Sequence, residues 1–394
     1  DLSSRKGGGG VAALIALATA ASMLLAASFD LVMTLIALET IAVCCYAIIV
    51  AGRTPAAAEA AMKYVIQGAV ATGLYLAGLA IHVGVTGGGS DLGRVAAGMP
   101  EFALASTAAT VFLLAAFAFK LGAVPFHSWA PDALETAPPS GSAFMASAPK
   151  IAAVLGLIIL FSLTVEQVAI KTLPTLNHVI LFATLAVGSI LLGNLAGLPQ
   201  TSYQRMLAYS GIAQVGYVLI GLATGSGAIP ATMFLVSVYG LAALGAFLAA
   251  QFVHAARLGW DGSIAGMAGL GREHPVVAIA LAILLLSLTG IPLTAGFWGK
   301  LYVFNFAVRA GLEWLVLLGV LGSVVSFGYY GAVLRSIFFD APPAKRGTES
   351  DTEDVTLDRA AAGVVLVCAS VVLALGIMPL FLGLFDPLTY FGYK

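Results

Sequence analysis

Long apolar segments follow one another along almost the whole chain. A membrane-spanning helix needs about 20 apolar residues, with a range of about 17–25. Eleven stretches meet this requirement and predict spans at 11–29, 31–50, 61–83, 102–120, 142–163, 178–198, 203–223, 229–253, 276–306, 315–338 and 360–384. The pattern therefore predicts an all-α polytopic membrane protein with about eleven transmembrane helices in a single membrane domain, 1–394.

Two of the predicted spans contain residues that break helices. Gly122 and Pro125 follow Lys120 at the end of the fourth span, and segment 127–134 is a candidate continuation. The step 290–292, Gly-Ile-Pro, interrupts the ninth span. The second break comes five spans after the first, an odd number, so the surrounding units are expected to be inverted repeats. We expect five-helix repeats at 11–163 and 174–338, followed by a hydrophilic loop and a last helix at 339–394.

Composition supports membrane insertion and excludes several other classes. The chain is 60% hydrophobic and 9% charged, with a mean hydropathy of +1.01, whereas soluble domains are about 25% charged. A net charge of −1 gives no indication of nucleic-acid binding. Cys44, Cys45 and Cys368 lie in apolar runs without metal-binding spacing, so we expect them to be packing residues. The sequence has no CxxC pair, haem-ligand pattern or dinucleotide fingerprint, so electrons are not expected to pass through it.

The basic residues are distributed unevenly. Of the eighteen lysines and arginines, ten fall on the side of the predicted bundle that holds the N-terminus and four on the other. The positive-inside rule then places the N-terminus in the cytoplasm. The remaining four lie within spans and are all lysines: Lys63, Lys120, Lys150 and Lys300.

A charge at membrane depth is a candidate functional group. A buried cation costs about 2.5–3.5 kcal/mol on insertion scales, so it persists mainly beside water or a partner. Buried lysine changes protonation readily, whereas arginine effectively does not, so intramembrane lysines without arginines indicate proton handling. Glu39 adds a carboxylate in the second span. Simpler interpretations remain open: Glu39 could be paired for stability, Lys63 and Lys300 could reach the interface, and His127 could cap a short helix.

Five segments resemble the antiporter-like subunits of respiratory complex I, over about 31–338. They are LIALETIAVCCYA around Glu39, AAMKYVIQGA around Lys63, the stretch from Lys120 to Lys150, QRMLAYSGIAQVGYV at 204–218 and TGIPLTAGFWGKLYVF at 289–304. The N-type subunit, called subunit 2 in mitochondria, has a lysine at the position that Lys300 occupies here, whereas the M-type subunit has a glutamate there. The family fold has fourteen helices, which implies that the first three are missing from this sequence.

The resemblance implies a role for each charged position. Glu39 and Lys120 match the pair whose charge coupling moves protons. His127 and Lys150 match linking residues, Lys300 the terminal lysine facing the output side, and Lys63 a lysine at the start of the sixth family helix. We expect Glu39, Lys120, Lys150 and Lys300 to share a hydrated row along the membrane midplane. The sequence departs from many relatives in having Gln214 where they have a histidine, and an amide can hold water but cannot titrate.

The implied function is that of a proton-translocating membrane-arm subunit of a complex I-type oxidoreductase, which couples NADH or a related donor to quinone. Flavin, iron–sulfur clusters and quinone would lie in partner subunits, and no cofactor is expected here. The expected neighbours are an M-type subunit, small K-, J- and A-type subunits and lipid, in a bacterial inner membrane or a mitochondrial or thylakoid equivalent. Alternatives are a cation/proton antiporter subunit of a multisubunit exchanger and a scaffold that pumps nothing. The lysine at Lys300 favours the first interpretation over the antiporter, and the four intramembrane lysines argue against the scaffold.

Overall fold

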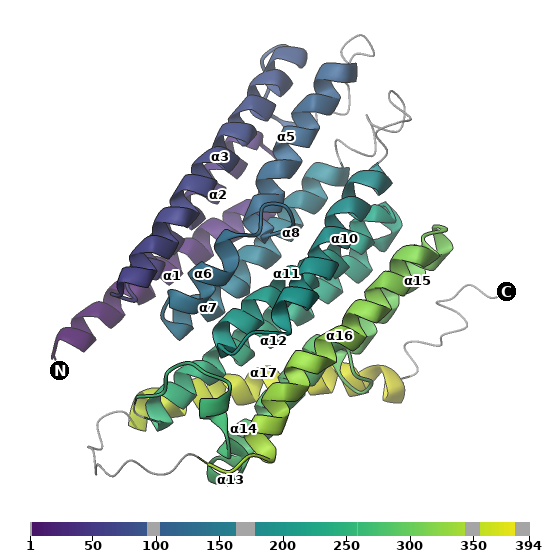
Figure 1. The fold of residues 1–394 in the computed structure, drawn as a ribbon. Coiled ribbons are helices and arrows are strands. Elements are labelled where there is room, and N and C mark those ends of the chain that lie inside the picture. The colour runs from purple at the N-terminus through teal and green to yellow at the C-terminus, as the bar shows by residue number, and fades with distance from the viewer. Residues whose placement is uncertain (1, 93–102, 163–177, 258, 343–354, 383–394) are drawn as a thin grey trace.

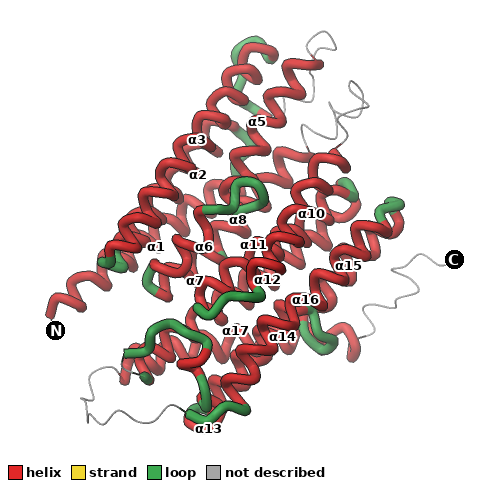
Figure 2. The backbone as a smooth tube through the Cα atoms, in the orientation of Figure 1, coloured by secondary structure: helices red, strands yellow, loops and turns green. Residues whose placement is uncertain are grey.

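The computed structural model describes residues 2–92, 103–162, 178–257, 259–342 and 355–382 (Figure 1). Within these ranges helices joined by loops make up the fold, with no strand among them (Figure 2). The helices are α1 (Leu2–Ala27), α2 (Leu31–Val50), α3 (Pro55–Val85), α5 (Ala103–Leu121), α6 (Trp129–Thr136), α7 (Pro139–Ala146), α8 (Ala148–Leu160), α10 (His178–Gly197), α11 (Tyr203–Ala223), α12 (Ile229–Ala256), α13 (Leu270–Glu273), α14 (Pro275–Thr289), α15 (Ala295–Arg309), α16 (Glu313–Phe338) and α17 (Val355–Leu382), with short 3₁₀ turns η3 (Ser226–Ala228) and η4 (Ala265–Met267).

The number of spans agrees with the sequence pattern. Ten helical segments in the described ranges are long and apolar enough to cross a membrane, with α7 and α8 counted together as one, and the shorter apolar helix α14 begins the interrupted ninth span. Residues 93–101 of the segment between the third and fourth predicted spans and residues 343–354 of the predicted hydrophilic loop lie outside the described residues, as does the boundary between the two predicted repeats at 163–174. The all-α membrane architecture is therefore confirmed.

Both predicted helix breaks are present. α5 ends before Gly122, which has φ +73°, and six further residues precede α6. α14 ends before Gly290, which has φ +90°, and α15 begins at Ala295. A residue with a Cβ rarely adopts these left-handed conformations, so glycine supports both turns. Each break leaves the last carbonyl groups of its first helix without helical partners.

The fifth predicted span contains an irregularity that the hydropathy pattern did not show. It begins earlier than expected, at Pro139, and is divided at Ser147 into α7 and α8. Ser147 has φ −114° and ψ −92°, outside the helical region, and Pro149 provides no backbone N–H to the helix that follows. This division places Lys150 in the first turn of α8.

Helix α11 occupies the centre of the bundle. Within its apolar window 94% of the residues are buried, and it lies beside α10 in Figure 1. The two backbones meet closely, because a Cβ added at Gly193 of α10 would lie 2.5 Å from the backbone nitrogen of Ala213 and 2.8 Å from the carbonyl oxygen of Tyr209. No side chain fits between α10 and α11 at this point.

Outside the spans, Asp30 fixes the start of α2. Its carboxylate accepts hydrogen bonds from the backbone N–H groups of Val32 at 2.9 Å and Met33 at 3.0 Å, and from the Ser90 hydroxyl at 2.5 Å. Burial alone would raise the pKa of Asp30, but the bonds from Ser90 and the two N–H groups lower it below its ordinary value. Asp30 is thus a charged N-cap at the entrance to the helix that carries Glu39.

Candidate functional site

Glu39 and Lys120 face one small cavity. Glu39 projects from α2, and its Oε1 accepts a hydrogen bond of 2.5 Å from the hydroxyl of Thr72 on α3. The cavity that both charged residues line has a volume of about 30 Å³. Since a water molecule needs about 10–15 Å³ of such space, one or two fit there. The two charges form no direct ion pair, so water can separate them.

Lys120 is buried at the end of α5 beside an aromatic stack. Its side chain is 5% exposed, and Nζ donates to the hydroxyl of Tyr64 at 3.3 Å. The Tyr64 ring stacks on Trp129 of α6 with centroids 4.3 Å apart, and Trp129 Nε1 donates to the Phe119 carbonyl at 3.0 Å. The stack therefore joins both sides of the first helix break next to the lysine.

Lys150 has a neutral environment. It is 1% exposed, and Nζ donates to the hydroxyl of Tyr239 on α12 at 3.4 Å. The ammonium lies 5.7 Å from the centroid of the same ring, within the range of a cation–π interaction. Tyr239 therefore binds the Lys150 ammonium through both its hydroxyl and its ring.

Lys300 lies against the second helix break. Its side chain is 5% exposed. Nζ donates to the carbonyl oxygens of Leu288 at 3.1 Å and Thr289 at 2.9 Å, which belong to the end of α14, and to the hydroxyl of Ser323 at 3.1 Å. The Tyr217 ring lies 4.1 Å from Nζ, measured to its centroid. The ammonium therefore binds within the protein instead of extending to the interface.

Gln214 belongs to the same region. Its Nε2 donates to the Leu288 carbonyl at 2.6 Å, the group that also accepts from Lys300. Gln214, Tyr239 and Lys300 line a cavity of about 10 Å³, enough for about one water. The environments of Lys150 and Lys300 thus meet at Tyr239.

The three buried lysines share one property. Among the ion pairs in the described ranges, none includes Lys120, Lys150 or Lys300. Their ammonium groups contact hydroxyls, carbonyl oxygens and aromatic rings. Hydroxyl and carbonyl groups accept hydrogen bonds without cancelling a charge, so each lysine can be charged or neutral in the same pocket.

His127 is placed beside the first break. It lies in the turn between α5 and α6, and its Nδ1 atom is buried without a hydrogen-bond partner. The structure shows no hydrogen bond from its side chain to Lys120 or Lys150. Its predicted linking role therefore remains a prediction.

Lys63 belongs to a separate group of charges, which we call the ionic cluster. Its side chain is 44% exposed and pairs with Glu59 and Asp132, each at 2.8 Å. Arg205 of α11 pairs with the same Asp132 at 2.8 Å and with Glu135 at 2.7 Å. The ionic cluster joins α3, α6 and α11, which indicates that Lys63 helps to hold α6.

Removing the arginine of the ionic cluster should weaken the fold. In Arg205→Gln, Asp132 and Glu135 lose the cation that they share while both remain partly buried. We expect the free energy of unfolding to fall by about 1–3 kcal/mol, the range for a buried polar group left without its partner. Thermal unfolding in detergent measures this as a lower midpoint. Arg335→Gln is the control, since Arg335 is 78% exposed and 3.8 Å from Asp340. Equal midpoints for the two variants would contradict the structural role of the cluster.

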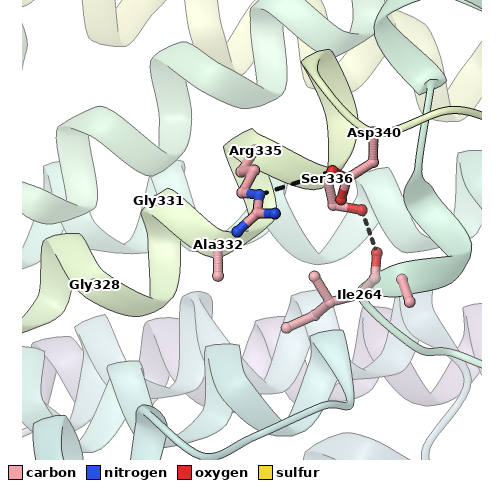
Figure 3. A pocket seen from close by; sticks show the side chains of 8 residues that line it. Ile264, Gly328, Gly331, Ala332, Arg335, Ser336 and Asp340 are labelled. Carbon is pink, nitrogen blue, oxygen red and sulfur yellow. Dashed lines mark hydrogen bonds and ion pairs between the residues drawn. The ribbon is translucent and has the colours of Figure 1, made fainter.

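A larger groove lies away from these residues. It has a volume of about 460 Å³ and lies at the end of α16, where Arg335, Ser336 and Asp340 surround it (Figure 3). Ser336 donates to the Ile264 carbonyl at 2.9 Å across the groove. None of the six predicted site residues lines it. In the described part of the chain no three His, Cys, Asp or Glu side chains gather as metal ligands.

These features define a class of protein. Paired broken helices that present buried ionisable residues are typical of ion-coupled membrane transporters. The family model described as "NADH:quinone oxidoreductase/Mrp antiporter, TM" matches residues 28–326. The chain belongs to this family.

Individual relatives agree with this assignment. The chain is 38% identical to NADH-quinone oxidoreductase subunit N 2 of Sorangium cellulosum, over 85% of this chain and 68% of that protein. It is 40% identical to subunit N of Moorella thermoacetica, over 84% of this chain and 68% of that one. A chain of respiratory complex I from Thermus thermophilus with bound aureothin superposes with a TM-score of 0.77 at 32% identity, over 96% of this chain and 79% of that chain. A chain of the Mrp complex from Dietzia sp. gives 0.82 at 22% identity, over 96% and 78%, and shows a shared fold.

Proposed function

We propose that this protein is a proton-translocating membrane-arm subunit of a complex I-type quinone oxidoreductase. The observation that carries the proposal is the burial of three lysines without a carboxylate partner, two of them beside helix breaks. Fixed structural cations are normally paired when buried. Lysines whose neighbours are hydroxyls and carbonyls suit groups that gain and lose a proton.

The proposed sequence of events begins at Glu39. A charge arriving from an adjoining membrane subunit changes the attraction between Glu39 and Lys120 across their shared cavity. While the attraction persists it favours protonated Lys120. When it is lost, the proton passes toward Lys150 and then Lys300, through water and polar side chains. His127 is a candidate link between Lys120 and Lys150.

In the proposal, partner subunits supply the redox cofactors and the energy source that this chain lacks. Flavin, iron–sulfur clusters and quinone are proposed to lie in partner subunits, because a lone proton path has no source of energy. M-type and small K-, J- and A-type membrane subunits are the proposed neighbours, with lipid on the remaining flanks. The excess of basic residues in the loops on the N-terminal side supports a cytoplasmic N-terminus in an energy-transducing membrane.

The test is to purify the tagged chain with its partners and reconstitute the assembly in vesicles. We expect flavin and iron–sulfur subunits to co-purify, and quinone reduction by NADH or another donor to acidify the vesicle lumen. The competing function is cation/proton exchange, which the fold shared with the Mrp chain makes possible. Sodium-driven proton movement in vesicles without redox subunits or donor would favour exchange and contradict the proposal.

A further inference from the structure

A tyrosine lies between the pocket of Lys150 and the cavity beside Lys300. Tyr239 is buried on α12, which packs against both α8 and α15. Its hydroxyl accepts the 3.4 Å hydrogen bond from Lys150, and it lines the cavity that Lys300 lines. Among the described residues, it alone has a hydrogen bond to the Lys150 side chain and a place in that cavity. One side chain therefore binds Lys150 and borders the cavity beside Lys300.

We propose that the hydroxyl of Tyr239 relays protons from Lys150 to the cavity of Lys300, and that Gly211 preserves the space for this transfer. The inference rests on the proposed proton translocation and adds two residues to its path. A hydroxyl can accept a hydrogen bond and donate one at the same time. It can therefore take part in a transfer without holding a net charge before or after it.

The proposed transfer moves one proton from Lys150 to Lys300. The Lys150 ammonium loses a proton to the Tyr239 oxygen as the original Tyr239 proton leaves for the water that fits in the 10 Å³ cavity. That water passes a proton to Lys300. One O–H bond forms on Tyr239 and one breaks, so Lys150 ends neutral, Lys300 ends charged and Tyr239 is unchanged. The amide of Gln214 binds the Leu288 carbonyl and takes no proton.

Gly211 of α11 faces this junction. A Cβ added there would lie 2.9 Å from the hydroxyl oxygen of Tyr239 and 3.1 Å from Nζ of Lys150. Both distances are shorter than ordinary contacts of about 3.5–4.0 Å between non-bonded atoms. A side chain would therefore displace the amine or the hydroxyl. The missing side chain keeps the two groups within hydrogen-bond distance.

The test removes one oxygen atom. Tyr239→Phe keeps the ring and its packing, so we expect normal assembly with redox-driven proton pumping per complex lowered about tenfold or more, a conservative value for a lost proton-transfer group. The matched control is Tyr203→Phe. Tyr203 is also buried, and its hydroxyl donates a hydrogen bond of 2.8 Å from α11 to the Ala246 carbonyl of α12. It has no hydrogen bond to any of the three lysines, and the control should pump at the wild-type rate.

A rescue experiment separates relay from packing. In the Tyr239→Phe background the hydroxyl is gone, and Gly211→Ser would supply another hydroxyl close to Lys150. We expect this double variant to regain part of the lost pumping, whereas Gly211→Ala in the same background should not. A role in packing would respond equally to serine and alanine, and equal recovery would overturn the relay.

Failure of the relay and failure of the proposed translocation path give different results. Wild-type pumping by Tyr239→Phe would overturn the relay. Lys150→Ala and Lys300→Ala, measured beside it, test the proposed function: if both pump normally, the translocation path itself is wrong. If Tyr239→Phe does not assemble, Gly211→Ala alone decides, since slower pumping supports the relay and the wild-type rate contradicts it. Gly73→Ala is its control, because nothing lies within 4 Å of a Cβ at that position.

Discussion

Lys120→Ala is expected to reduce redox-driven proton pumping at least about tenfold while the assembly remains intact. The change removes the ammonium that faces the Glu39 cavity and leaves the stack of Tyr64 and Trp129 in place. Proton-transfer groups typically contribute 10²–10⁴-fold, so tenfold is a conservative bound. Pumping should be measured in vesicles by lumenal acidification, per complex, with the quinone reduction rate recorded at the same time.

Glu39→Gln tests the other half of the pair. Glutamine has nearly the same shape and can still accept the hydrogen bond from Thr72, so a loss of pumping would report the missing charge. Glu59→Gln is a matched control on α3, since Glu59 is 68% exposed and pairs with Lys63. Arg335→Ala is the control for Lys120, because both cations lie in the last turn of a helix. Wild-type pumping in both Glu39→Gln and Lys120→Ala would remove the pair from the mechanism.

Lys300→Arg is expected to pump about as poorly as Lys300→Ala. Arginine keeps the positive charge but holds its proton, since its pKa is above about 12. In the native pocket Nζ donates to Leu288, Thr289 and Ser323, and these acceptors can also bind a guanidinium. A carrier that cannot release its proton should block the final step. Vesicle pumping at equal amounts of assembled complex measures the effect.

The paired variants distinguish two roles for Lys300. If arginine supports wild-type pumping and alanine does not, Lys300 acts as a fixed positive charge and carries no proton. The guanidinium group is larger than the amine, and the adjoining cavity is only about 10 Å³. The amount of complex in the membrane therefore shows whether Lys300→Arg still folds and assembles. A low amount of complex would indicate poor fit, and in that case the rate per assembled complex remains the value to compare.

The sequence predicted the breaks and the burial of the three lysines because both follow from local composition. Gly122, Pro125 and Gly290 interrupt apolar runs, and a lysine within such a run must be buried or reach water. Pro149 indicates a helix irregularity next to Lys150, but the division of the span at Ser147 was not predicted, because an apolar segment continues through it. Hydropathy does not show a backbone turn in the middle of a span.

The partners of the lysines could not be predicted, because they come from distant parts of the chain. Tyr239 is 89 residues from Lys150 and Tyr64 is 56 residues from Lys120. The Lys63–Asp132 contact spans 69 residues. Single tyrosines in apolar spans give no sign of which helix they face. Packing between helices therefore determines these contacts, and the pattern along one helix does not reveal them.

The close contact of α10 and α11 at Gly193 limits which parts of the path can move. Sliding one helix along the other would bring a residue with a Cβ to the place of Gly193, where a Cβ would lie only 2.5 Å from a backbone nitrogen. Helix α11 carries Gly211, Gln214 and Tyr217, so we expect it to stay fixed while protons move along the second half of the proposed path. Rotamer changes and water reorientation are faster than collective helix motions by several orders of magnitude. In the proposed path, we therefore expect charge to pass this helix pair through a rearrangement of hydrogen atoms and not through a movement of the backbone.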